Sequence, residues 1–176
     1  FRLFTIQADT LRIGCKKHAS RMIQLRSPNP SALKGGPMQI YFSCSITGGR
    51  QDQPIYQQMV THLQARGHAV PTALLADAHM EPPEAQSDAA TIYQRDVTWV
   101  KTSQALIAEV STPSHGVGYE IALAESLGLP VLCCYQAGRK VSKMITGNPN
   151  PAVMVRAYRT PEEALEIMDA FLKKIS

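Results

Sequence analysis

The stretch ALIAEVSTPSHGVGYEIALAESLGLPVLCCY, residues 105–135, decides the fold of this chain. Its first apolar run, residues 105–110, is typical of a parallel strand that is buried on both faces. A helix is expected over residues 116–127, and Gly128 is expected to end it. A second buried strand follows at residues 131–135, so the stretch predicts one βαβ unit.

The same alternation of strand and helix continues on both sides of this unit. The pattern predicts strands at residues 39–44, 69–75, 105–110, 131–135 and 153–158, and helices at residues 54–66, 90–101, 116–127, 141–146 and 161–175. Strands that alternate with helices form parallel sheets with right-handed crossovers. We therefore expect an α/β fold with a five-stranded parallel sheet in the order 2-1-3-4-5.

The positive net charge of +4 comes from one end of the chain. Residues 1–37 contain seven Lys or Arg and one Asp, whereas the remainder contains 11 basic and 13 acidic residues. The folded domain is expected at 38–176, and the near-equal numbers of basic and acidic residues in it predict no nucleic-acid partner. Three explanations of residues 1–37 stay open: a non-functional extension, which we favour, a disordered tail, or a processed targeting segment.

Composition also indicates where the protein is located and which cofactors it could bind. No apolar run approaches the length of a membrane span, so we expect no membrane partner. The four cysteines form no CxxC pair, and three of them fall on expected strands, where a free cysteine acts as a small hydrophobe. This favours a reducing, cytoplasmic location, with nuclear or organellar alternatives open. No His/Cys cluster has zinc-ligand spacing, and we expect neither metal nor cofactor.

Glu120 is the unusual residue of the central stretch. It lies in the first turns of a helix, just past the carboxyl end of a strand, where doubly wound sheets bind ligands. An acidic residue there also interacts favourably with the helix dipole by less than about 1 kcal/mol, so Glu120 alone requires no function. Gly116 and Gly118 indicate close approach of a ligand to the backbone, and Ser114 adds a hydroxyl. Together these neighbours favour a ligand site.

A glycine-rich loop is expected after the first strand, at residues 45–50. It matches neither the Walker A pattern nor GxGxxG. Its backbone amides, with Ser45, Thr47 and Arg50, are predicted to hold one phosphate. A plain tight turn at Gly48 is the alternative. In the expected strand order this loop faces the one that carries Ser114.

Three segments then resemble a known family: YFSCSITGGR (41–50), RDVTWVKTSQALIAEVSTPSHGVGYEIALAESLGLPVLC (95–133) and GRKVSKMI (138–145). They are similar to the 2′-deoxynucleoside 5′-monophosphate N-glycosidases (2′-deoxynucleoside 5′-phosphate N-hydrolases) of the nucleoside 2-deoxyribosyltransferase superfamily. The resemblance covers residues 39–171, and SHGVGYE is its most specific part. It implies a flavodoxin-like three-layer sandwich, a homodimer, and cofactor-free cleavage of the bond between base and deoxyribose in a nucleotide.

The resemblance also implies roles for individual residues. Glu120 matches the catalytic glutamate that attacks C1′, Tyr41 matches a tyrosine at the sugar, and Asp96 matches a catalytic aspartate, although its helical context alone indicates a solvated carboxylate. The phosphate-binding serines correspond to Ser45, Ser114 and Ser142, the last reaching in from the partner subunit. The remaining predicted substrate-binding positions are Ser43, Ile46, Thr47, Gly48, Arg50, Tyr56, Gly116, Gly118, Lys143 and Met144.

Two departures from the family pattern leave the substrate open. Thr47 stands where better-known members carry an arginine near the phosphate, and Leu74 stands where they carry a histidine near the base. The alternatives are a nucleoside 2-deoxyribosyltransferase, which needs no phosphate pocket, a CMP-type ribonucleotide N-glycosidase, and a nucleotide-binding sensor without turnover. The three serines favour the hydrolase over the transferase. The presence of Glu120, Asp96 and Tyr41 together argues against a sensor.

Overall fold

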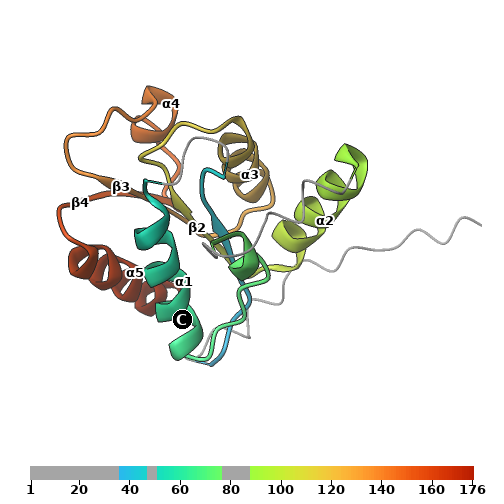
Figure 1. The fold of residues 1–176 in the computed structure, drawn as a ribbon, viewed down its shortest axis with the longest axis horizontal. Helices are drawn as coiled ribbons and strands as arrows, with labels where there is room; N and C mark the ends of the chain where they lie inside the picture. Colours follow the sequence, from blue (N-terminus) through green and yellow to red (C-terminus); the bar gives the residue numbers. More distant parts are fainter. Residues whose placement is uncertain (1–35, 47–50, 77–87) are drawn as a thin grey trace, which may run out of the picture.

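The computed structural model describes residues 36–46, 51–76 and 88–176, which form an α/β fold (Figure 1). The elements in chain order are β1 (Ile40–Ser43), α1 (Gln53–Ala65), the 3₁₀ helix η2 (Ala73–Ala76), α2 (Ala89–Thr102), β2 (Ala105–Glu109), α3 (His115–Ser126), β3 (Val131–Gln136), α4 (Lys143–Thr146), β4 (Val153–Tyr158) and α5 (Pro161–Ile175). The expected βαβ unit is therefore present as β2, α3 and β3.

One parallel sheet of four strands, in the order β1-β2-β3-β4, organises the described residues. The register pairs Tyr41 of β1 with Leu106 of β2, and Ala108 of β2 with Cys133 of β3. All five residues of β2 are buried, as expected for a strand between two neighbours and two helical layers.

Helices cover both faces of the sheet. Alternate residues of β1 separate into the two cores: Ile40 and Phe42 pack with α1 and α5, whereas Tyr41 packs with α3 and Val100 of α2. Figure 1 shows α1 beside α5, with α3 on the opposite side. This alternation follows from the two-residue period of a strand, and it directs Tyr41 toward the helix that carries Glu120.

The expected second strand, residues 69–75, was wrong, and the sheet has four strands instead of five; these four keep the expected order, 1-3-4-5 in the numbering of the five expected strands. Only a single parallel bridge forms there, between Gln39 and Ala69, and the chain then enters η2. Pro71 interrupts the run, since proline cannot donate to a ladder. The Thr72 hydroxyl replaces the missing strand: it donates to the Phe42 carbonyl at 2.8 Å and accepts from the Phe42 amide at 3.2 Å.

The other elements lie within a few residues of their expected positions, and α5 and β4 match them fully. Gly67 and Gly128, the expected helix ends, have φ of +83° and +70°, a conformation that favours glycine. Asp88 and Thr160 act as N-caps, because their side chains accept hydrogen bonds from the amides of Thr91 and Glu163.

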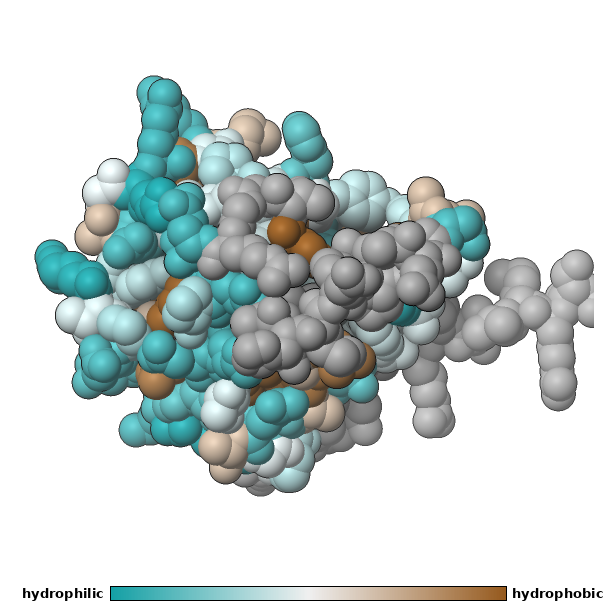
Figure 2. Space-filling view, viewed as in Figure 1, coloured by the Kyte–Doolittle hydropathy of each residue, from teal (hydrophilic) through white to brown (hydrophobic). Residues whose placement is uncertain are grey.

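The outer surface is mostly hydrophilic on the face drawn in Figure 2, with hydrophobic residues in small separate spots. No helix among the described residues is long and apolar enough to cross a membrane. The proposed extension at residues 1–37 lies almost wholly outside the described residues, as do Thr47, Gly48 and Arg50 of the glycine-rich loop.

Candidate active site

Glu120 is held by two hydroxyl groups from β1. Tyr41 donates to one carboxylate oxygen, Oε1, at 2.7 Å, and Ser43 donates to the other, Oε2, at 2.5 Å. Both donors are almost fully buried, with exposed fractions of 1% and 2%. Because each oxygen has its own donor, the orientation of the carboxylate is defined.

Local sequence explains how these three side chains meet. Tyr41 and Ser43 are two residues apart on β1 and therefore point to the same face of the sheet. On the opposing element, Ser114 is the N-cap of α3 and accepts from the amide of Val117 at 3.4 Å. The helix then carries Glu120 in its second turn, above the end of β1.

The electrostatic surroundings keep the Tyr41 hydroxyl protonated. Burial, and after it the negative charge of Glu120 and their hydrogen bond, raises the pKa of Tyr41 far above its usual value. A protonated phenol donates to a carboxylate, so Tyr41 is the donor in its hydrogen bond with Glu120.

A cavity of about 260 Å³ lies in front of this carboxylate. Seven of the predicted site residues line it: Tyr41, Ser43, Ile46, Asp96, Ser114, Gly116 and Glu120. They come from β1 and the loop after it, from α2, and from α3 and the loop before it, which meet at the carboxyl edge of the sheet. The tertiary structure thus brings all three predicted catalytic residues into one cavity.

Asp96 reaches this cavity from α2 as half of an ion pair. Arg95 Nε donates to Asp96 Oδ1 at 2.8 Å, and the same guanidinium lies 4.9 Å from the centre of the Trp99 ring. The two side chains of the pair are each only about one fifth exposed. Asp96 is therefore a second positioned carboxylate at the site.

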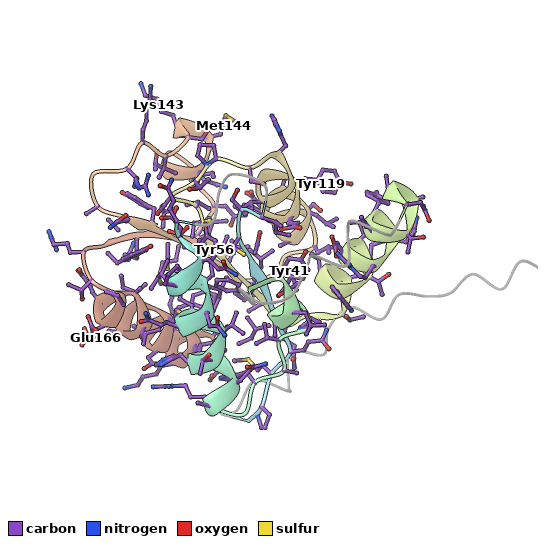
Figure 3. The ribbon with its side chains drawn as sticks, in the orientation of Figure 1. Tyr41, Tyr56, Tyr119, Lys143, Met144 and Glu166 are labelled. Atoms are coloured by element: carbon purple, nitrogen blue, oxygen red, sulfur yellow. The ribbon has the colours of Figure 1, made fainter. Side chains whose placement is uncertain are left out.

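A larger cavity of about 890 Å³ adjoins the first, with Ser114 and Val117 lining both. Four more predicted residues line it: Gly118, Ser142, Lys143 and Met144. Within one chain, Ser142 thus lines a different cavity from Glu120. Its hydroxyl accepts from the Met144 amide at 3.3 Å at the start of α4. Lys143 and Met144 lie on α4, far from Tyr41 (Figure 3).

The two glycines of the SHGVGYE segment are not required by packing within the described chain. A Cβ added at Gly116 would come no closer than 3.8 Å to another atom, and one added at Gly118 would meet nothing within 4 Å. Neither glycine has a positive φ. Since backbone geometry does not require them, close approach of a ligand remains their predicted role.

Two predicted residues lie away from both cavities. Ser45 is 3% exposed in the loop after β1. Tyr56 packs into the core on α1, with its ring 6.4 Å from that of Phe42. Its buried hydroxyl has no hydrogen-bond partner among the described residues. Their substrate contacts stay predictions, as do those of the undescribed Thr47, Gly48 and Arg50.

Sequence reasoning missed part of the cavity wall. Phe42, Cys44, Ile92 and Val117 also line the cavity of Glu120. Ile92 had a usable signal, because it lies four residues before Asp96 and so on the same helix face. The others are ordinary core residues by sequence, and only the fold shows that they border the site.

Comparison with known proteins assigns the chain to a family. Residues 40–165 match the family model described as nucleoside 2-deoxyribosyltransferase. A putative 2′-deoxynucleoside 5′-phosphate N-hydrolase 1 of Methanococcoides burtonii is 40% identical over 121 residues, which are 69% of this chain and 99% of that protein. The 5-hydroxymethyl-dUMP N-hydrolase of Mus musculus is 43% identical over 136 residues, or 75% of this chain and 78% of the mouse protein.

One solved structure supports the fold alone. The CMP N-glycosidase BcmB of Clostridium botulinum superposes with a TM-score of 0.59 at 17% sequence identity, covering 76% of this chain and 98% of that one. The family model spans well over half of the 176 residues, and it contains both the strand with Tyr41 and the helix with Glu120. The chain therefore belongs to the nucleoside 2-deoxyribosyltransferase family.

Proposed function

We propose that this protein hydrolyses the N-glycosidic bond of 2′-deoxynucleoside 5′-monophosphates, releasing the free base and 2-deoxyribose 5-phosphate. One observation carries the proposal: Glu120, with a hydroxyl donor on each carboxylate oxygen, shares a small cavity with a second carboxylate, Asp96. The names of the relatives at about 40% identity support the same reaction.

The first chemical step is an attack of Glu120 on C1′ of the sugar. A Glu120 oxygen forms a bond to C1′ while the bond from C1′ to the base nitrogen breaks, through an oxocarbenium-like state that a carboxylate stabilises. Asp96 is the proposed acid: it enters this step protonated, still accepting from Arg95 Nε, and gives its proton to the departing base. The product of this step is a deoxyribosyl ester of Glu120.

The second step returns the enzyme to its starting state. Water attacks C1′, the ester bond to Glu120 breaks, and Asp96 accepts the proton of the water. Tyr41 and Ser43 hold the carboxylate in position before and after the ester forms. Tyr41, placed beside C2′, would also disfavour a 2′-hydroxyl group.

The 5′-phosphate is bound in this proposal by the hydroxyls of Ser45, Ser114 and Ser142 and by the glycine-rich loop. Ser142 is supplied by a second copy of the chain. Two observations support this arrangement: within one chain Ser142 lines a different cavity from Glu120, and Met144, two residues on, is a large apolar side chain that is 85% exposed and so open to a partner.

The deciding experiment compares free base released from dGMP, 5-hydroxymethyl-dUMP, deoxyguanosine and GMP at equal concentration, by chromatography. Two charge-assisted hydrogen bonds to the phosphate, at about 1.5–3 kcal/mol each, predict a preference of at least a hundredfold for dGMP over deoxyguanosine. Equal rates on dGMP and deoxyguanosine would instead favour the transferase. Faster release from GMP would favour a ribonucleotide N-glycosidase, and binding without release a sensor.

A further inference from the structure

Three separate loops carry the serines that are proposed to bind phosphate. The loop after β1 contains Ser45, the loop after β2 contains Ser114, and the loop after β3 contains Ser142. The β-ladders end before these loops, so the sheet does not by itself determine how far apart they lie. A phosphate held by hydroxyls from several loops needs those loops at defined distances.

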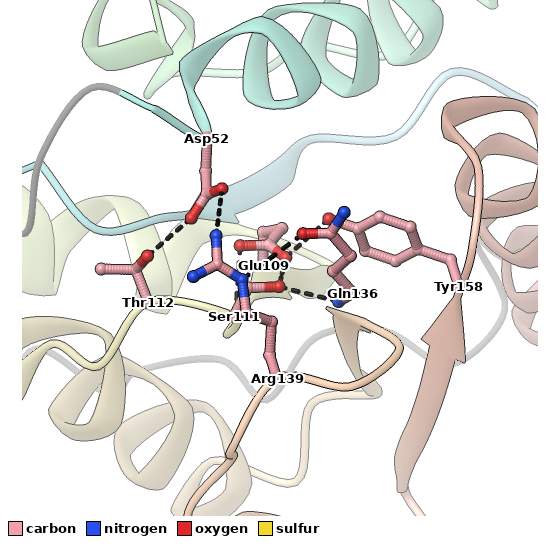
Figure 4. Close-up of polar contacts among 7 residues, drawn as sticks. All are labelled: Asp52, Glu109, Ser111, Thr112, Gln136, Arg139 and Tyr158. Atoms are coloured by element: carbon pink, nitrogen blue, oxygen red, sulfur yellow. Dashed lines mark hydrogen bonds and ion pairs between the residues drawn. The ribbon is translucent and has the colours of Figure 1, made fainter.

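A polar tie connects these loops at Asp52. Thr112, in the loop after β2, donates to Asp52 Oδ2 at 2.6 Å, and Arg139, in the loop after β3, donates to Oδ1 at 3.0 Å (Figure 4). Asp52 itself is the second residue after the glycine-rich loop. Asp52 and Thr112 are each only 9% exposed, so water does not readily replace the bond between them, whereas the Arg139 side chain is 37% exposed.

Helix capping does not explain Asp52. The residue is the N-cap of α1, where an aspartate side chain normally accepts a hydrogen bond from a backbone amide of the first turn. Its side chain makes no such bond here. Both carboxylate oxygens are used between loops instead, which is a different role from stabilising α1.

A buried cluster beside the tie holds the base of the same loops. Ser111 donates to Glu109 through its hydroxyl and accepts from the Gln136 amide at 2.7 Å, while Tyr158 donates to Glu109 at 2.8 Å. These bonds attach the start of the loop after β2 to the ends of β3 and β4 (Figure 4). The loop after β2 is therefore already hydrogen-bonded to its neighbours at Ser111, the residue before Thr112.

We infer that Asp52 is a positioning residue which, with Thr112 and Arg139, sets the distances between the loops that bind the 5′-phosphate. The inference rests on the proposed function. In the proposed dimer the loop after β3 presents Ser142 to the partner's cavity. The hydrogen bonds of Asp52 therefore position loops for two phosphate sites, that of their own chain and that of the partner. Loss of the tie weakens phosphate binding but spares the chemistry at C1′, because Glu120 is held by its own hydrogen bonds to β1.

The test compares Asp52→Asn with Asp169→Asn. Asp169 is a matched control, because its carboxylate also has two partners, Arg66 at 2.7 Å and His62 at 2.8 Å, but it links α1 to α5 away from the loops. We expect Asp52→Asn to raise KM for dGMP about tenfold or more and to change kcat less than threefold. Release of base from deoxyguanosine should not change, and Asp169→Asn should leave all three values unchanged.

Variants of Arg139 separate positioning from direct contact. Arg139→Met should raise KM for dGMP as Asp52→Asn does, and Arg139→Lys, which keeps the positive charge, should raise KM much less. The double variant Asp52→Asn with Arg139→Met should have a KM no higher than that of either single variant. If Arg139 bound the phosphate directly, Asp52→Asn would free it and lower KM. That result, or an unchanged KM, would overturn the inference.

A binding measurement keeps this test separate from that of the reaction. Calorimetric titration with dGMP and with deoxyguanosine is made on Glu120→Gln, with and without Asp52→Asn, because these dissociation constants are then free of turnover; where wild type itself releases no base, it is titrated directly. If wild type binds dGMP without releasing base, the proposed function fails, but a tenfold weaker Kd in Asp52→Asn still supports the tie. If the protein with Asp52 intact binds both ligands equally, there is no phosphate site to position and the inference falls.

Discussion

Replacing Tyr41 with phenylalanine tests the geometry around Glu120 with little disturbance to packing. The substitution keeps the ring in the core and removes only the hydroxyl that donates to Glu120 at 2.7 Å. Tyr41 is 1% exposed, so water cannot easily replace the lost donor. A hydrogen bond to a charged group contributes about 1.5–3 kcal/mol, which corresponds to a loss of about 10-fold to 150-fold in kcat/KM.

The control for this prediction is Tyr158→Phe. Tyr158 is also buried, and its hydroxyl also donates to a carboxylate, Glu109, at 2.8 Å, but it does not line the cavity of Glu120. Initial rates of base release from dGMP should fall for Tyr41→Phe, while kcat of Tyr158→Phe stays within about twofold of wild type. Melting temperatures show whether both variants fold. A folded Tyr41→Phe enzyme with wild-type kcat/KM would refute the assigned role.

Three further predictions concern the nucleophile, the dimer and a buried acid. Glu120→Gln should lower base release by several powers of ten while dGMP still binds, as measured by turnover and calorimetry; near-normal turnover would exclude the mechanism. Mixing inactive Glu120→Ala and Ser142→Ala chains should restore activity, because one site of the mixed dimer is intact; no restoration would mean that Ser142 acts within its own chain. Burial raises the pKa of Glu109 above its ordinary value of 4.5. Above about pH 4.5 the unfolded chain loses this proton while the folded protein retains it, so the free energy of unfolding falls as pH rises. Thermal melts from pH 4 to 8 should therefore show Glu109→Gln gaining stability relative to wild type as pH rises, and a constant difference would contradict this.

Much of the fold was predictable because its signals are local. Buried strands such as residues 105–109 are continuous apolar runs, and helix ends at Gly67 and Gly128 need a backbone conformation that glycine adopts easily. The expected strand at residues 69–75 failed for a reason that the sequence did contain, namely Pro71. The replacement of that strand by the Thr72 hydroxyl was not predictable, since it depends on the edge of β1 being within reach.

The candidate site was predictable in its residues but not in its contacts. Glu120, Asp96 and Tyr41 were identified from position and from resemblance, and the structure brings them to one cavity. The bond from Ser43 to Glu120 was not foreseen, nor was the ion pair between Asp96 and Arg95. Such contacts join residues whose side-chain distances depend on how helices pack on the sheet.

The amino-acid sequence by itself determined the alternation of strands and helices, the family, and the identity of the catalytic candidates, because these depend on local periodicity and on motifs. Only the tertiary structure decided the number of strands, the separation of Ser142 from Glu120 within one chain, and the tie of Asp52 to Thr112 and Arg139. Asp52 illustrates the difference: its place before a helix indicates a cap, yet its carboxylate binds two loops 60 and 87 residues away. Hydrogen bonds over such separations form only when packing has already placed their partners side by side.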